Sequence, residues 1–117
     1  MSKKRKNPFL SELSDEEKGD LESVKWMFDN YDSSVIVEEL QSALERADIV
    51  TTLAAIETLI SRGESERAVK AMNIEVDHND NEFFAKLADF TMNTTDPVFI
   101  RAYSPFGVVS VEAIFQL

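Results

Sequence analysis

The sequence predicts a mainly α-helical fold, a compact bundle of about five helices with a C-terminal β-hairpin. Three observations support this prediction: apolar residues recur at helical spacing, capping residues precede several of these stretches, and the pattern changes to alternation near the C-terminus. With 117 residues, 44% of them hydrophobic, the chain is long enough for one hydrophobic core. We expect a flexible basic tail over residues 1–13 and a single domain, helices and hairpin together, over residues 14–117.

The first predicted helix begins at a capping box formed by Ser14 and Glu17. In this motif each side chain accepts a hydrogen bond from the backbone N–H of the other residue. Leu21, Val24 and Phe28 follow at helical spacing and share one face of the helix. We expect that face to pack on the core.

Residues 35–61 carry two apolar stripes. The first consists of Ile36, Leu40, Ala43, Leu44 and Ala47, and the second of Ile49, Leu53, Ile56 and Ile60. At about 100° per residue, one straight helix would place the two stripes on nearly opposite sides. We therefore predict two helices with a break at residues 46–48, where Asp48 caps the second helix. The alternative is one helix packed between two partners.

Two further helices are expected before the C-terminal region. The helix that follows the break ends at Arg62 and Gly63, because a basic residue followed by glycine is typical of a helix C-terminus. A short helix then covers residues 64–72. Asn79 and Glu82 form a second capping box, with Asn79 as the cap, in front of an apolar stripe rich in phenylalanine.

Residues 97–117 predict the β-hairpin. β-branched and aromatic residues fill 98–103, a turn with proline and glycine follows, and residues 108–117 alternate between an apolar and a polar side. The exposed edge of such a hairpin can pair with a second copy or with a partner strand. The alternative is two short helices, with Pro97 at the first position of one and Ser110 capping the other.

No segment carries a complete catalytic, metal-binding or nucleotide-binding signature. The chain has no cysteine, which excludes disulfides, thiolate metal sites and a cysteine nucleophile. His78 is the single histidine, so one chain cannot build a metal site from several histidines. The three glycines are scattered, which excludes a glycine-rich phosphate loop. We therefore expect no enzymatic activity, no cofactor and no bound metal.

The sequence also indicates a cellular compartment. No apolar run approaches the ~18 residues of a transmembrane helix, and no apolar segment of a secretory signal follows the basic N-terminus. The lack of cysteine fits a reducing compartment. We therefore expect a cytoplasmic protein, in a bacterial or host-cell cytosol, without a membrane partner.

The charge is distributed unevenly along the chain. Lys3, Lys4, Arg5 and Lys6 form a basic arm, whereas residues 12–117 hold the other 8 of the 12 basic residues and all 22 acidic residues, a net charge of −14. A body this acidic repels nucleic acid and anionic lipid and attracts basic proteins. The alternative is that the charge serves solubility alone.

The first predicted helix also offers a candidate binding surface. Trp26, Met27 and Phe28 are consecutive and cannot all face one core, so at least one should be exposed or contact a partner. Aromatic residues and methionine are enriched in protein interfaces, and several acidic residues lie close by. The predicted partner-binding residues are Glu16, Glu17, Asp20, Glu22, Trp26 and Tyr31.

The sequence therefore favours a small acidic protein without enzymatic activity that binds or regulates a protein partner with a basic surface. In a sharper form of this hypothesis it is an inhibitor that occupies a nucleic-acid-binding groove of its partner, as phage-type inhibitors of host defence do. One alternative is a self-associating assembly subunit, such as a virion component, joined through the hairpin. Another is a nucleic-acid binder that uses the basic arm.

Overall fold

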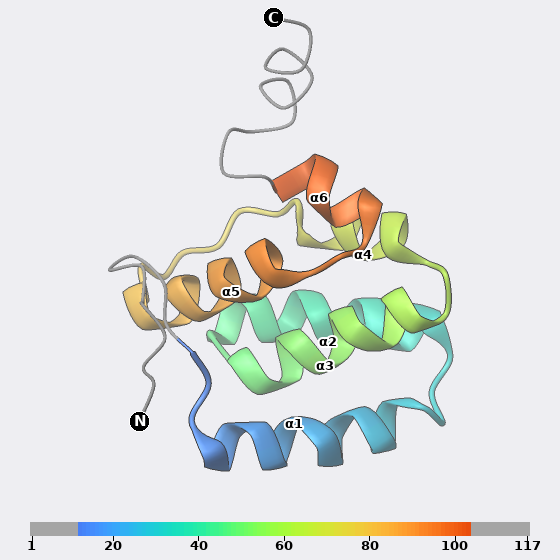
Figure 1. The fold of residues 1–117 in the computed structure, drawn as a ribbon, viewed down its shortest axis with the longest axis horizontal. Helices are drawn as coiled ribbons and strands as arrows, with labels where there is room; N and C mark the ends of the chain where they lie inside the picture. Colours follow the sequence, from blue (N-terminus) through green and yellow to red (C-terminus); the bar gives the residue numbers. More distant parts are fainter. Residues whose placement is uncertain (1–11, 104–117) are drawn as a thin grey trace, which may run out of the picture.

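The computed structural model describes residues 12–103 of the chain. This part contains six α-helices and no strand. The helices are α1 (Asp15–Phe28), α2 (Ser33–Arg46), α3 (Ile49–Ser61), α4 (Ser65–Met72), α5 (Asn81–Asn93) and α6 (Pro97–Tyr103). In Figure 1, α1 forms the lowest layer, α2 and α3 pack together in the middle, and the last three helices lie above them. The mainly α-helical prediction is confirmed. None of these helices has the length and apolar character that a membrane span requires.

Helix α3 is the centre of the core. Both α1 and α2 pack along it, and α4 and α5 contact it as well. Its sequence suits this position, because apolar and small residues occur on every side of the helix. The buried residues of α3 are Ile49, Thr52, Leu53, Ala54, Ala55, Ile56, Thr58 and Leu59. The two buried threonines satisfy their hydroxyl groups locally, since Thr52 donates to the carbonyl oxygen of Asp48 and Thr58 to that of Ala54.

The predicted break between the second and third helices is confirmed. Ala47 ends α2 in the left-handed region, at φ 59° and ψ 39°. Asp48 then caps α3, and its carboxylate accepts a hydrogen bond of 3.1 Å from the backbone N–H of Thr51. The first apolar stripe therefore lies on α2 and its C-cap residue. The second stripe lies on α3, which packs against both α1 and α2.

Two of the predicted helix ends are confirmed and one is wrong. The capping box is present, with the backbone N–H of Ser14 donating to Glu17 at 2.9 Å and that of Glu17 donating to Ser14 at 3.1 Å. Helix α3 ends at Ser61, two residues before a glycine with φ 75°. The predicted cap at Asn79 is wrong, because Asp80 accepts from the backbone N–H of Phe83 at 2.9 Å. An aspartate gives a charge-assisted bond at this position, and Phe83, which donates to it, is buried in the core.

The predicted hairpin is wrong in the half that the structure describes. Its expected first strand is helix α6, which begins at Pro97 as in the alternative prediction. The carboxylate of Asp96 accepts from the backbone N–H groups of Val98 and Phe99, at 2.9 and 3.2 Å. An aspartate cap followed by proline at the first helical position outweighs the strand preference of the next residues. The turn and the second strand, residues 104–117, lie outside the described residues. Residues 12–103 contain no strand edge through which the predicted self-association could occur.

Gly19 lies on the exposed side of α1 and has no steric reason to be glycine. A Cβ atom built there meets no other atom within 4 Å. We expect Gly19→Ala to raise the free energy of unfolding by about 0.5–1 kcal/mol, because glycine in a helix interior is destabilising relative to alanine by that amount. The measurement is the urea midpoint at unchanged slope. Gly63→Ala is the control and should be destabilising, since Gly63 has a φ of 75°; a loss of stability in Gly19→Ala would contradict the expectation.

Candidate functional site

The outer face of α1 combines a highly exposed tryptophan with several acidic residues. Leu21 and Phe28 fix the orientation of this helix, because both are buried against the core. The opposite side is exposed and carries Trp26 near the C-terminal end of the helix, with a relative exposure of 75%. We define the outer face of α1 as Asp15, Glu16, Gly19, Asp20, Glu22, Ser23, Trp26, Met27, Asp29 and Asn30, all of them exposed.

Three consecutive large residues near the end of α1 point in different directions. Phe28 is 1% exposed, Met27 is 44% exposed and Trp26 is 75% exposed. The prediction that at least one of them leaves the core is therefore confirmed. An indole this exposed keeps a large apolar area in water, and tryptophan can bury about 150–250 Å² in a contact.

Acidic residues surround Trp26 on the outer face. Asp15, Glu16, Asp20 and Asp29 make no ion pair within residues 12–103, and Glu22 lies 3.6 Å from Lys25. Lys25 is nearer to Glu57 on α3, at 2.7 Å, and this contact raises the pKa of Lys25. Acids in the first turn favour the helix itself through its dipole, but the acids beyond the first turn have no such local benefit.

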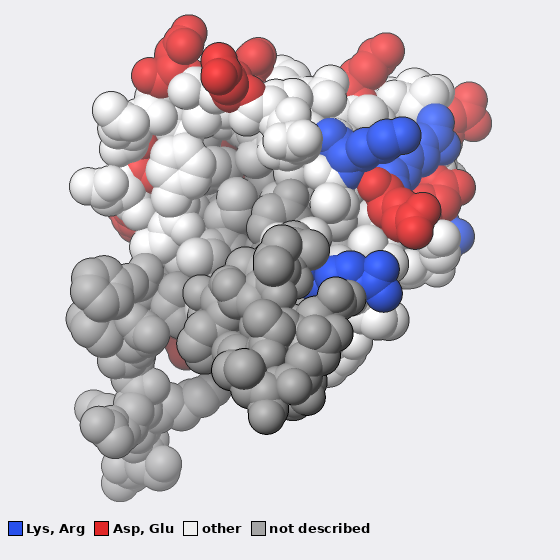
Figure 2. All heavy atoms as spheres, turned by 90° about the horizontal axis from the view of Figure 1, so that it is seen from above, with Lys and Arg blue, Asp and Glu red and all other residues white. Residues whose placement is uncertain are grey.

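The upper side of the molecule carries a different charge pattern. Figure 2 looks down on this side and shows lysine and arginine gathered at one end, with acidic side chains between them. Helix α4 lies at this end, and its Arg67 is 3.4 Å from Glu64. Basic and acidic groups are therefore interspersed there, whereas on the outer face of α1 four of the five acids make no ion pair among the described residues.

Three long-range contacts hold α1 in place. Lys25 pairs with Glu57 of α3, and the carboxylate of Glu17 accepts from Lys86 of α5 at 2.8 and 2.9 Å. Arg62, just after α3, donates to the carbonyl oxygen of Phe28 at 3.1 Å. These contacts fix the orientation of the helix. Arg62 also donates to the carbonyl oxygen of Asp29 at 3.4 Å, but no side chain of the outer face makes an ion pair with another element of residues 12–103.

The predicted binding residues divide into two groups. Glu16, Asp20, Glu22 and Trp26 lie together on the outer face of α1. Glu17 instead belongs to the capping box and to the pair with Lys86, and Tyr31 is half-buried with its ring 5.5 Å from that of Phe28. The basic arm, Lys3, Lys4, Arg5 and Lys6, lies outside the described residues.

The pair of Glu17 and Lys86 links stability to pH. Hydrogen bonding from Lys86 lowers the pKa of Glu17, and Glu17 in turn raises the pKa of Lys86. A lowered folded-state pKa means that the carboxylate stabilises the fold above its ordinary pKa of 4.5, and that this stabilisation is lost as pH falls through the folded-state value. The raised pKa of Lys86 affects stability at alkaline pH. The charged ammonium group stabilises the fold below its ordinary pKa, and this stabilisation is lost as the pH rises through the folded-state value.

Glu17→Gln should therefore reduce the acid sensitivity of the protein. We expect the wild type to lose more unfolding free energy than the variant between about pH 6 and pH 3, as measured by urea denaturation at each pH. Glu38→Gln is the control, because Glu38 is exposed on α2 without an ion pair among the described residues. If Glu17→Gln and Glu38→Gln show the same pH slope, the salt bridge does not contribute to stability.

His78 has the contacts of a structural residue. Its Nε2 donates to the carbonyl oxygen of Leu44 at 2.7 Å, and its ring stacks on Phe84 with centroids 5.2 Å apart. The backbone N–H of Asp80 donates to Nδ1 at 3.3 Å, which occupies the second ring nitrogen. Within residues 12–103, no group of three or more histidine, aspartate or glutamate side chains is arranged to hold a metal ion.

Comparison with known proteins gives no functional assignment, so the outer face of α1 is the basis for the functional argument. The sequence matches no protein-family model, and neither the curated proteins nor the solved structures contain a significant match.

Proposed function

We propose that this protein is a small non-enzymatic interaction protein that binds a basic protein surface through the outer face of α1. The observation that carries the proposal is the exposure of Trp26, at 75%, on a face with five acidic residues. Tryptophan is among the residues that most often dominate binding energy at interfaces, particularly near the interface centre. Trp26 suits that role, because it is exposed and acidic residues lie on both sides of it along the helix.

The acids define the chemistry of the partner. Glu16 and Asp20 are four residues apart on one helix, where like charges destabilise the helix by a few tenths of a kcal/mol. Asp15, Glu22 and Asp29 add further negative charge to the same face. This arrangement favours lysine- and arginine-rich surfaces and accelerates encounter with them, and it repels nucleic acid. A basic groove that binds nucleic acid in the partner is one surface of this chemistry, and occupying it would make the protein an inhibitor.

A charge-reversal variant tests the proposal. Glu16→Lys, Asp20→Lys and Glu22→Lys are combined, and Glu17 is left intact because it supports the fold. The matched control combines Glu38→Lys, Glu45→Lys and Glu66→Lys, which reverse three exposed acids on α2 and α4. The partner is captured from the native host with the tagged full-length chain and identified by mass spectrometry, and both variants are then titrated against it.

We expect the α1 variant to slow association with the partner by about ten- to hundredfold at low salt. The control variant should retain nearly all of the association rate, although its net charge is the same. Equal losses in the two variants would mean that net charge, and not the outer face of α1, determines binding. No loss in either variant would exclude electrostatic recognition through these acids.

A further inference from the structure

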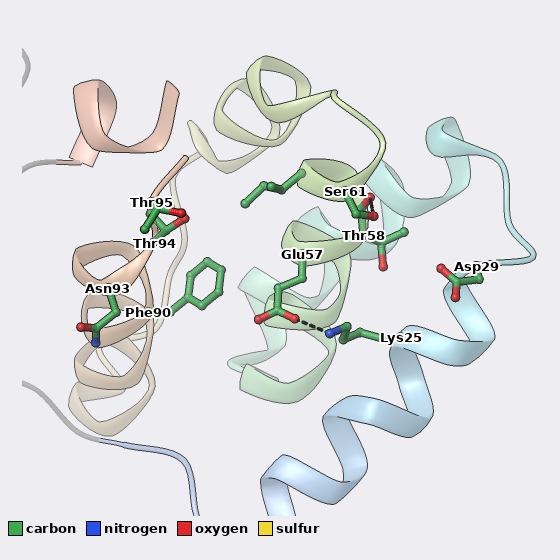
Figure 3. Close-up of a pocket in the computed structure, with 10 residues that line it drawn as sticks. Lys25, Asp29, Glu57, Thr58, Ser61, Phe90, Asn93, Thr94 and Thr95 are labelled. Atoms are coloured by element: carbon green, nitrogen blue, oxygen red, sulfur yellow. Dashed lines mark hydrogen bonds and ion pairs between the residues drawn. The ribbon is translucent and has the colours of Figure 1, made fainter. Parts of the chain in front are cut away.

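A groove runs between α1 and α5, with α3 as its floor. Two adjoining cavities of about 550 and 320 Å³ share Glu57, Phe90 and Asn93 and so form one continuous depression. Figure 3 shows Lys25 of α1 and Phe90 of α5 on opposite sides, with Glu57 of α3 between them. One end lies near Leu13, and the other near Thr94.

The groove exposes part of the core. Its apolar lining residues are Leu13, Leu21, Leu53, Ile60 and Phe90. Leu13, Ile60 and Phe90 are only half-buried, although they pack against the core. Lys18 lines the α1 side and makes no ion pair within residues 12–103. Glu12 and Asp89 line the same part of the groove, so its charge is mixed. The groove therefore suits an apolar segment.

Residues 104–117 of the same chain have this chemistry. Their hydrophobic residues are Phe106, Val108, Val109, Val111, Ala113, Ile114, Phe115 and Leu117. Glu112 is the single charged residue in the segment. Burying one large apolar side chain contributes about 1.5–3 kcal/mol of stability. We therefore expect the segment to cover an apolar surface.

The position and length of the segment favour this groove. It follows α6, which packs against α4 and α5 and begins at Pro97, two residues after the groove residue Thr95. Fourteen residues extend over at most about 46–50 Å, and the longest dimension of the molecule is 45 Å. Because a short tether gives a local concentration in the millimolar range, a segment of the same chain outcompetes one from a second copy.

We propose that residues 104–117 dock in the groove between α1 and α5 of their own chain. The apolar side chains cover Ile60 and Phe90. Docking completes the core on the side where α1 and α5 are separated. The proposal does not depend on the outer face of α1, which shares only Asp29 with the lining of this groove.

The lack of native cysteine makes a site-specific spin label straightforward. Asn93→Cys places the label in the groove, since Asn93 is exposed and lines both cavities. Glu38→Cys places it on α2 as the control, and Ser61→Cys provides a second groove position if Asn93→Cys folds poorly. The full-length chain is used throughout, and the probe is the methyl spectrum of its isotope-labelled valine, isoleucine and leucine residues.

We expect the groove label to broaden the methyl signals of residues 108–117 beyond detection, and the control label to leave them visible. In a mixture of spin-labelled chains with separate isotope-labelled chains, the broadening should disappear. Broadening that persists in the mixture would mean that a second copy occupies the groove and would overturn the proposal. Broadening of Leu10 in place of 108–117, or the same effect from both labels, would overturn it as well.

Discussion

Replacing Phe28 with alanine should remove about 3–5 kcal/mol from the free energy of unfolding. Phe28 is 1% exposed and is the last residue of α1, where its ring lies 5.5 Å from that of Tyr31. Deleting the ring leaves a cavity at the point where α1 enters the core, in addition to the lost burial of the ring. Small domains are stable by only about 5–15 kcal/mol, so this variant should be partly unfolded near physiological temperature.

Met27→Ala is the matched control for Phe28→Ala. The two positions are adjacent in sequence, but Met27 is 44% exposed and should contribute less than about 0.5 kcal/mol. Urea denaturation followed by circular dichroism measures both variants. Equal losses in stability would show that the orientation of α1 on the core is different from the one described, and with it the position of Trp26.

Replacing Trp26 with alanine should weaken partner binding by about 30-fold or more, because a central tryptophan typically contributes at least about 2 kcal/mol. Stability should change by less than about 0.5 kcal/mol, since the side chain is 75% exposed. This combination of large binding loss and intact fold separates a binding residue from a structural one. Isothermal titration with the captured partner measures the first quantity, and urea denaturation the second.

Val35→Ala controls for the loss of any exposed apolar side chain. Val35 is 40% exposed and lies on α2, outside the outer face of α1. Its replacement should leave binding unchanged. If Val35→Ala weakens binding as much as Trp26→Ala does, or if neither variant affects it, the outer face of α1 is not the binding surface.

The parts of the fold that depend on neighbouring residues could be predicted from the sequence. The capping box at Ser14 and the break at Asp48 involve residues at most three positions apart, so both motifs are visible in the sequence. The two opposed apolar stripes of residues 35–61 implied either two helices or one helix packed between two partners. The structure combines both features, since α3 is a separate helix and packs between α1 and α2.

Other features depend on competition between local signals. The residues of α6 prefer strands, but Asp96 and Pro97 provide a helix start, and burial of Phe99 stabilises the helix against the core. Asn79 and Asp80 are both good caps, and Asp80 is the one used, since its carboxylate accepts from the backbone N–H of Phe83. Propensity alone could not rank these alternatives.

The candidate site was only partly predictable for a similar reason. The stripe of Leu21, Val24 and Phe28 implies that Trp26 points away from the core, and the structure agrees. The role of Glu17 could not be foreseen, because its partner Lys86 is 69 residues away in sequence. The groove between α1 and α5 likewise exists only through the tertiary arrangement of three helices.

The most direct test of the account uses the single tryptophan of the chain. Incorporation of fluorotryptophan gives one fluorine resonance, and its shift between light and heavy water reports the solvent exposure of Trp26. We expect a large solvent-dependent shift in the free protein and a much smaller one once the captured partner is bound at saturation. A resonance that keeps its position and its solvent dependence in the saturated complex would contradict binding through the outer face of α1.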